Sequence, residues 1–95
     1  MSSFISDFGK SLARENARYN ICVNSMCPGP TDTPLLQEEI RENPDLIHRM
    51  TKIIPFRRVG QPVDMANAIS FLCSKDADYI TGQTLSVSGG LTMVD

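Results

Sequence analysis

One short loop holds the residues best suited to chemistry, Cys27-Pro28-Gly29-Pro30-Thr31-Asp32-Thr33. It follows a predicted strand and leads into a predicted helix, and in open α/β sheets ligands bind at the carboxyl ends of strands. Pro28 and Gly29 let the backbone turn sharply and approach a ligand closely. The helix N-terminus offers free N–H groups that suit phosphate, and the Thr33 hydroxyl could cap the helix or turn toward a ligand. From this loop alone, a plain strand-to-helix connection with a threonine cap is the favoured interpretation.

Titratable residues outside the segment 27–31 are weaker candidates for catalysis or ligand binding. The single histidine, His48, has no Ser, Cys or Asp spaced to form a triad with it, so we interpret it as a solvent-exposed residue. Arg57 and Arg58 could bind an acidic group such as a CoA phosphate, but a loop charge near the next helix is the favoured interpretation. Asp32 is expected to cap a helix rather than to act as a hinge. We therefore predict neither a metal site nor a catalytic residue among them.

The elements that position the loop follow from apolar spacing and helix-boundary residues. A helix is predicted over 3–18 with a left-handed stop at Asn20, and a strand over 21–26 that Pro28 breaks. Two short helices, 34–42 and 44–52, each follow a capping residue and a proline, Thr33-Pro34 and Asn43-Pro44. The apolar stripe of the first helix consists of Phe4, Ile5, Phe8, Leu12 and Ala13.

The remaining elements complete an α/β order. A stronger helix is predicted over 62–74 with Asp64 in its first turn, and an alternating strand over 84–88. A strand followed by helices and another strand is a crossover connection, which favours parallel pairing. Two parallel strands cannot bury both faces of a sheet. The fold class is therefore α/β, the C-terminal part of a Rossmann-type doubly wound parallel sheet in the order helix, strand, two lid-like helices, helix, strand.

Composition limits the other possibilities. The chain has 95 residues, of which 41% are apolar and 21% charged, so one ordinary globular domain at most is expected. We expect neither a membrane span nor a secretory signal. A net charge of −2 argues against a nucleic-acid binder. The cysteines, Cys22, Cys27 and Cys73, fit neither a disulfide framework nor a zinc site, which favours a reducing, cytoplasmic setting. Cys22 and Cys27 are interpreted as small apolar residues in and after the strand.

The chain resembles the short-chain dehydrogenase/reductase family over nearly its whole length. The matching segments occur in the right order and spacing: Lys10-Ser11-Leu12-Ala13-Arg14-Glu15, Ile21-Cys22-Val23-Asn24, Pro28-Gly29-Pro30-Thr31-Asp32-Thr33, Arg58-Val59-Gly60-Gln61-Pro62 with Asp64, Tyr79-Ile80-Thr81-Gly82-Gln83, and Val87-Ser88-Gly89-Gly90. Any one segment is weak, but together they are specific. Within the family the chain looks most like bacterial reductases of 3-oxoacyl thioesters and hydroxyacyl-CoA dehydrogenases of alicyclic acids.

The resemblance implies an oxidoreductase that uses NAD or NADP, with this chain contributing the last two strands of the sheet. Pro28, Gly29 and Thr31 would lie beside the nicotinamide, with the Thr31 backbone meeting the carboxamide, and the Thr33 hydroxyl would reach the pyrophosphate. Residues 34–54 would form a mobile substrate lid, with Pro34, Leu35, Leu36 and Ile40 as its lining residues. The final helix and strand would lie at a subunit interface, because these enzymes are commonly tetramers.

The sequence also departs from the family. The glycine-rich turn that binds the pyrophosphate, the active-site serine and the Tyr-x-x-x-Lys pair are absent from the 95 residues: Tyr19 is followed four residues later by Val23, and Tyr79 by Gln83. Counting back from Lys10, the family's lysine would fall at Ser2. Carbonyl reduction in the family needs the tyrosine as acid, its pKa lowered by the lysine and the cofactor charge. We therefore expect the 95-residue chain alone to be inactive.

A hypothesis from a different class remains open. The first helix and the last helix-strand unit match surfaces that pair subunits in the family, so the chain could be a non-catalytic interaction protein that associates with itself or with larger subunits. The sheet edge left without a neighbour would favour association. A third possibility is that Met1 is internal to a longer enzyme. The choice between NAD and NADP, the substrate and the reaction direction stay open.

Overall fold

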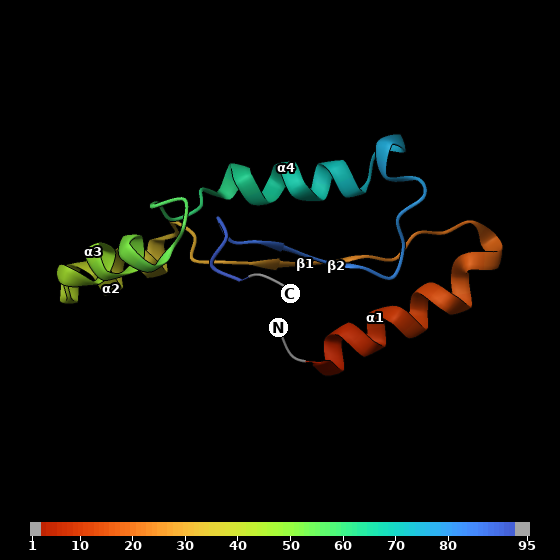
Figure 1. Ribbon diagram of the computed structural model, residues 1–95, viewed down its shortest axis with the longest axis horizontal. Coiled ribbons are helices and arrows are strands. Elements are labelled where there is room, and N and C mark those ends of the chain that lie inside the picture. The colour runs from red at the N-terminus through yellow and green to blue at the C-terminus, as the bar shows by residue number, and fades with distance from the viewer. Residues whose placement is uncertain (1–2, 93–95) are drawn as a thin grey trace. The chain divides into compact units, whose positions relative to one another are not determined.

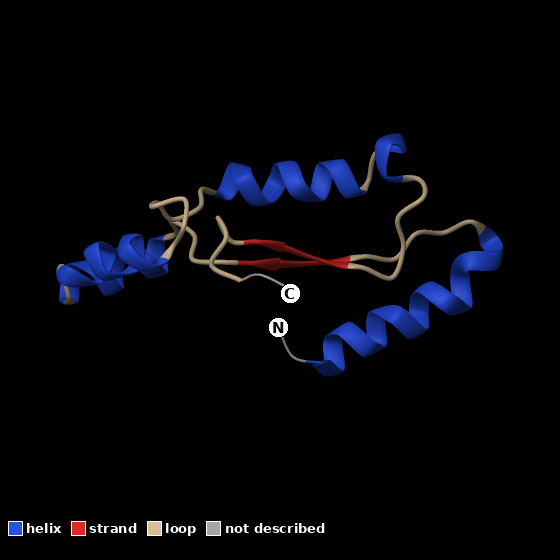
Figure 2. Ribbon diagram, viewed as in Figure 1, coloured by secondary structure: helices blue, strands red, loops and turns tan. Residues whose placement is uncertain are grey.

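The computed structural model describes residues 3–92, and the side chains from residue 7 onward. In chain order it contains α1 (Ser3–Asn16), a 3-10 turn (Ala17–Tyr19), β1 (Ser25–Pro28), α2 (Pro34–Glu42), α3 (Asp45–Ile53), α4 (Pro62–Leu72), a second 3-10 turn (Lys75–Ala77) and β2 (Thr84–Val87) (Figures 1 and 2). The predictions made for Ser2 and for the side chains of Phe4 and Ile5 fall outside the described residues. The observed order confirms the predicted alternation of helices and strands.

The two strands are hydrogen-bonded neighbours and run parallel, as Figure 2 shows. The Ser25 N–H donates to the Gln83 carbonyl at 2.9 Å, and the Gly29 N–H donates to the Val87 carbonyl at 2.9 Å. Because donor and acceptor positions advance together along both strands, the register is that of a parallel pair. The intervening helices therefore form the crossover connection that the sequence predicts.

The predicted bounds of the first strand were wrong. Residues 21–24 are outside β1, which instead begins at Ser25 and includes Pro28. The Asn24 side chain donates to the Ile80 carbonyl at 3.0 Å and accepts from the Gln83 N–H at 3.1 Å, so local side-chain bonds replace strand pairing there. Ser25 and Gly29 donate to the β2 side, so the missing N–H of Pro28 falls on the opposite edge and costs no bond to β2.

The observed bounds of β1 also place two cysteines differently from the prediction. Cys22 precedes β1 and is exposed, whereas Cys27 lies within the strand and is half-buried. The Cys22 thiol contacts the Asp78 carbonyl at 3.6 Å. The prediction that Cys22 packs within the strand was therefore wrong.

The helix boundaries show which capping predictions hold. Thr33 caps α2: its side-chain oxygen accepts from the Leu36 N–H at 3.3 Å, and Pro34 is the first helical residue. Asn20 adopts the predicted left-handed conformation, with φ 60°. The predicted cap at Asn43 was wrong, because Pro44 occupies the N-cap position of α3 and makes no side-chain capping bond. The Leu46 N–H is satisfied instead by the Asn43 carbonyl, at 3.0 Å.

The chain divides into two compact units. One comprises residues 3–27 and 67–85 and buries Ala13 and Ala77; the other comprises residues 28–66 and 86–92 and buries Leu36 and Ile54. No residue of α4 is buried, although this helix is apolar around much of its surface. A helix that is apolar on all sides is typical of a buried position in a larger assembly. In the described range, no helix combines the length and the hydropathy needed to cross a bilayer.

Candidate functional site

The loop after β1 is fixed first by the end of β2. Gly29 donates to Val87 at 2.9 Å, which extends the parallel ladder one residue beyond β1. A Cβ atom at Gly29 would lie 2.8 Å from both the Cα and the Cβ of Ser88. The predicted need for glycine at this position therefore has a cause inside the chain, because the backbone of Ser88 leaves no room for a side chain.

Thr31 is held by a second, isolated parallel bridge to Gly60. The Gly60 N–H donates to the Pro30 carbonyl at 2.8 Å, and the Asp32 N–H donates to the Gly60 carbonyl at 2.7 Å. In such a bridge the peptide groups that flank the central residue make the bonds, so the N–H and carbonyl of Thr31 itself point to the opposite edge. The Thr31 hydroxyl donates to the Gly29 carbonyl at 2.8 Å, and Thr31 is half-buried. The N–H and carbonyl of Thr31 therefore form a polar edge on the side of the loop away from Gly60.

The N-terminus of α2 follows two residues later. The Thr33 oxygen is used as an acceptor by the cap, but a hydroxyl also has one hydrogen to donate. Asp32 does not cap this helix, contrary to the sequence prediction, because Thr33 occupies the capping position. The Asp32 carboxylate instead accepts from the Gln37 side-chain amide at 3.1 Å. Pro34 has no N–H, and the N–H groups of Leu36 and Gln37 both donate to Thr33, so the first turn leaves the Leu35 N–H and the hydrogen of the Thr33 hydroxyl for an anion.

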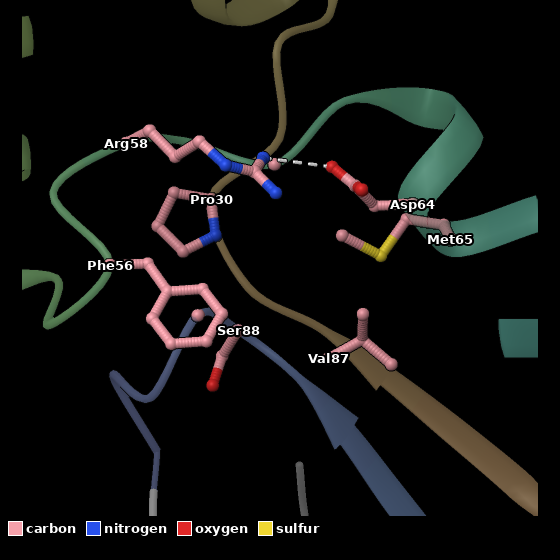
Figure 3. Close-up of a pocket in the computed structure, with 9 residues that line it drawn as sticks. Pro30, Phe56, Arg58, Asp64, Met65, Val87 and Ser88 are labelled. Atoms are coloured by element: carbon pink, nitrogen blue, oxygen red, sulfur yellow. Dashed lines mark hydrogen bonds and ion pairs between the residues drawn. The ribbon is translucent and has the colours of Figure 1, made fainter. Parts of the chain in front are cut away.

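An ion pair between Arg58 and Asp64 holds the loop that carries Gly60 (Figure 3). The Asp64 carboxylate Oδ2 accepts from the Arg58 guanidinium at 3.0 Å and from the Gln61 N–H at 2.7 Å. The hydrogen bond from Arg58, followed by that from Gln61, lowers the pKa of Asp64 below its ordinary value. These contacts confirm the structural interpretation of Arg58. Arg57 donates to the Lys52 carbonyl at 2.6 Å instead.

The ion pair borders a hollow of about 190 Å³. In Figure 3 the rings of Phe56 and Pro30 lie on one side of it and the side chains of Met65 and Val87 on the other. The Cβ of a residue at position 60 would meet the Met65 Cε at 2.9 Å, so this methionine packs closely over Gly60. The hollow thus lies directly behind the loop that carries Thr31.

The predicted lid residues differ in burial. Leu36 is only 8% exposed, whereas the neighbouring Leu35 is 68% exposed. Ile40 is half-buried and Pro34 is exposed. α2 is therefore anchored through Leu36 and presents Leu35 to its surroundings. His48, on α3, is exposed as predicted.

Sequence reasoning missed the part played by Gly60. It lies far from Thr31 in the chain, and no local pattern indicates their pairing. The hydrogen bond from the Gln61 N–H to Asp64 could have been predicted from the sequence. An acidic residue at the third helical position, after a proline at the first, is typical of a carboxylate that accepts from the N-cap N–H.

The chain is similar to known proteins in sequence and in fold. The model of a family described as enoyl-(acyl carrier protein) reductase matches residues 4–92. An acetoacetyl-CoA reductase from Acinetobacter sp. (strain RA3849) is 45% identical over 86 residues, which are 90% of this chain and 34% of that protein. A 3-oxoacyl-[acyl-carrier protein] reductase with bound NAD from Brucella melitensis is 38% identical with a TM-score of 0.82, over 97% of this chain and 32% of that one. The structure of ElxO with NADP bound is 33% identical with a TM-score of 0.82, over 92% of this chain and 35% of that one. The chain thus spans about a third of the length of the relatives it matches.

Proposed function

The chain belongs to the short-chain dehydrogenase/reductase family, and we propose that it forms the nicotinamide side of an oxidoreductase site that uses NAD or NADP. The substrate would be a hydroxyl or ketone compound, with 3-oxoacyl thioesters as the class to be tested first, since reductases of such thioesters are among its relatives. The observation that carries this proposal is the orientation of Thr31, whose backbone N–H and carbonyl point away from the bridge to Gly60.

The donor set of this loop fits the proposed cofactor. The carboxamide of nicotinamide has N–H donors and an oxygen acceptor. The Thr31 carbonyl can accept from those donors, and the Thr31 N–H can donate to that oxygen. The start of α2 offers the Leu35 N–H and the Thr33 hydroxyl to a pyrophosphate. When bound, NAD or NADP supplies or accepts the hydride. Pro28 ends β1, and Gly29 packs closely against Ser88. Together they position Thr31 at the end of the sheet.

The proton for carbonyl reduction must come from outside these residues. Neither tyrosine begins a Tyr-x-x-x-Lys sequence, and Tyr79 is exposed at a turn before β2. We therefore infer that the 95-residue chain by itself turns over no ketone. Any turnover by a longer polypeptide would depend on an acid contributed by its other residues.

Residues 34–54 are proposed as the substrate lid. The exposed Leu35 side chain supplies apolar surface to an acyl chain, while the buried Leu36 keeps α2 in place. The expected result is that Leu35→Ser raises the KM for a 3-oxoacyl thioester and leaves the Kd for NADH unchanged, since Thr31 and Thr33 are untouched.

The first experiment is to measure the intact mass of the native polypeptide, captured from its source with an antibody to residues 76–90. Titrating that polypeptide with NADH, followed by NADH fluorescence, then tests the site, and acetoacetyl-CoA tests turnover. Saturable binding that Thr33→Ala weakens would support the proposal. Absence of NADH and NADPH binding by the native polypeptide would contradict it. Turnover by the purified 95-residue chain would contradict the inference of inactivity.

A second candidate function is subunit pairing without catalysis. It is favoured by the apolar residues that α4 exposes, among them Val63 at 59%, Ile69 at 48% and Phe71 at 44%. A homo-oligomer, with four subunits as in many family members, is the form expected. Size-exclusion chromatography of the native polypeptide tests this: a discrete oligomer that Phe71→Glu dissociates would support pairing, and a monomer would contradict it.

The proposed setting is cytoplasmic, without nucleic-acid or membrane partners. This proposal rests on the free thiols of Cys22, Cys27 and Cys73 and on the net charge of −2. Localisation of the tagged native polypeptide in its source cells would test it.

A further inference from the structure

The ion pair between Arg58 and Asp64 has two partners beyond itself, and both are backbone groups next to Gly60. The Arg58 guanidinium that reaches Asp64 also donates to the Val59 carbonyl at 3.2 Å. The Asp64 carboxylate also accepts from the Gln61 N–H at 2.7 Å. The pair therefore fixes the peptide groups on both sides of Gly60.

Gly60 in turn fixes the edge that faces the proposed cofactor. Its N–H and carbonyl bond to Pro30 and Asp32, the two neighbours of Thr31, at 2.8 and 2.7 Å. A shift of Gly60 would move both bonds at once and rotate the Thr31 peptide groups. Hydrogen bonds thus connect the ion pair to both neighbours of Thr31, and Figure 3 shows the one between Arg58 and Asp64.

We propose that Arg58 and Asp64 are positioning residues, which hold Gly60 against Thr31 and thereby set the backbone edge that meets the nicotinamide. This inference rests on the proposed function, since it assigns the pair a purpose in cofactor binding. The pair is partly solvent-exposed, with side chains 55% and 31% accessible, and exposed pairs add little to global stability. The pair fixes the position of one loop. Its removal is therefore expected to change amide exchange in that loop and to leave the global free energy of unfolding unchanged.

The test uses amide hydrogen exchange and cofactor affinity in the native polypeptide. Asp64→Asn keeps the size of the side chain and removes its charge. Exchange at the Gly60 and Asp32 amides is expected to rise about fivefold, as for loss of one charge-assisted bond. Exchange at the Gly29 amide, which bonds Val87, is expected to stay constant. The Kd for NADH is expected to rise by a similar factor.

Conservative and matched variants separate positioning from stability. Arg58→Lys retains the charge and is expected to restore part of the affinity that Arg58→Gln loses. Asp76→Asn removes a carboxylate from the first turn of another helical segment and is expected to change neither exchange nor affinity. The urea midpoint is expected to stay within error in all four variants.

Each outcome decides the inference. Unchanged exchange at Gly60 in Asp64→Asn overturns the support that the pair gives to the loop. Raised exchange with an unchanged Kd overturns its role toward the cofactor. Equal increases at Gly29 and Gly60 show a merely structural role and also overturn it. A native polypeptide that binds no cofactor at all overturns the proposed function instead, and the exchange data still report on the support of the loop.

Discussion

Gly29→Ala tests whether the turn out of β1 is set by contact with β2. The added Cβ would lie 2.8 Å from the Ser88 Cα, about 0.7 Å short of the roughly 3.5 Å at which carbon atoms attract best. A backbone atom cannot move aside as a side chain can, so the strands must separate and the bond from Gly29 to Val87 must lengthen. Overpacking of this kind costs about 2 kcal/mol.

The assay is urea denaturation of the native polypeptide, with fluorescence or circular dichroism as the signal. At a slope of roughly 2 kcal/mol per molar urea, this loss lowers the midpoint by about 1 M. Gly60→Ala is the matched control. Its Cβ would be crowded by the flexible end of Met65, at 2.9 Å, while the Pro30 carbonyl oxygen lies at an ordinary 3.5 Å, so it is expected to cost much less than Gly29→Ala. The reasoning is refuted if Gly29→Ala leaves the midpoint unchanged, or if the control costs as much.

Two further changes can be measured in the same way, and a third by NMR titration. Thr33→Ala removes the α2 cap and is expected to cost about 1 kcal/mol, whereas Thr33→Ser keeps the hydroxyl and costs little. Asn20→Ala is expected to cost about 1 kcal/mol because its φ is 60°, and Asn20→Gly should be close to neutral; equal effects would contradict this. The hydrogen bond from Arg58 lowers the pKa of Asp64, so the carboxylate keeps its charge and its bond to the Gln61 N–H as pH falls through the ordinary carboxyl pKa near 4. Arg58→Gln is expected to raise the pH at which Asp64 titrates by NMR, and an unchanged titration would count against the pair.

Local chemistry explains which parts of the fold could be predicted. α2, α4 and β2 were placed almost to the residue, because a proline at the first helical position and strict alternation in a strand are signals carried by adjacent residues. β1 was displaced because the bonds of Asn24 come from Ile80 and Gln83. Those partners are distant in the chain, so no pattern around residue 24 indicates them.

The sequence by itself determined the element order and the parallel pairing, and it predicted the loop from Pro28 to Thr33 as a candidate binding site. These follow from the spacing of apolar residues and from the backbone preferences of proline, glycine and threonine, which are local properties. Only the tertiary structure decided why Gly29 must be glycine and which way Thr31 faces, because Ser88 and Gly60 approach from other parts of the chain. Contacts between distant segments depend on how strands and loops meet in space, and that information belongs to no single stretch of sequence.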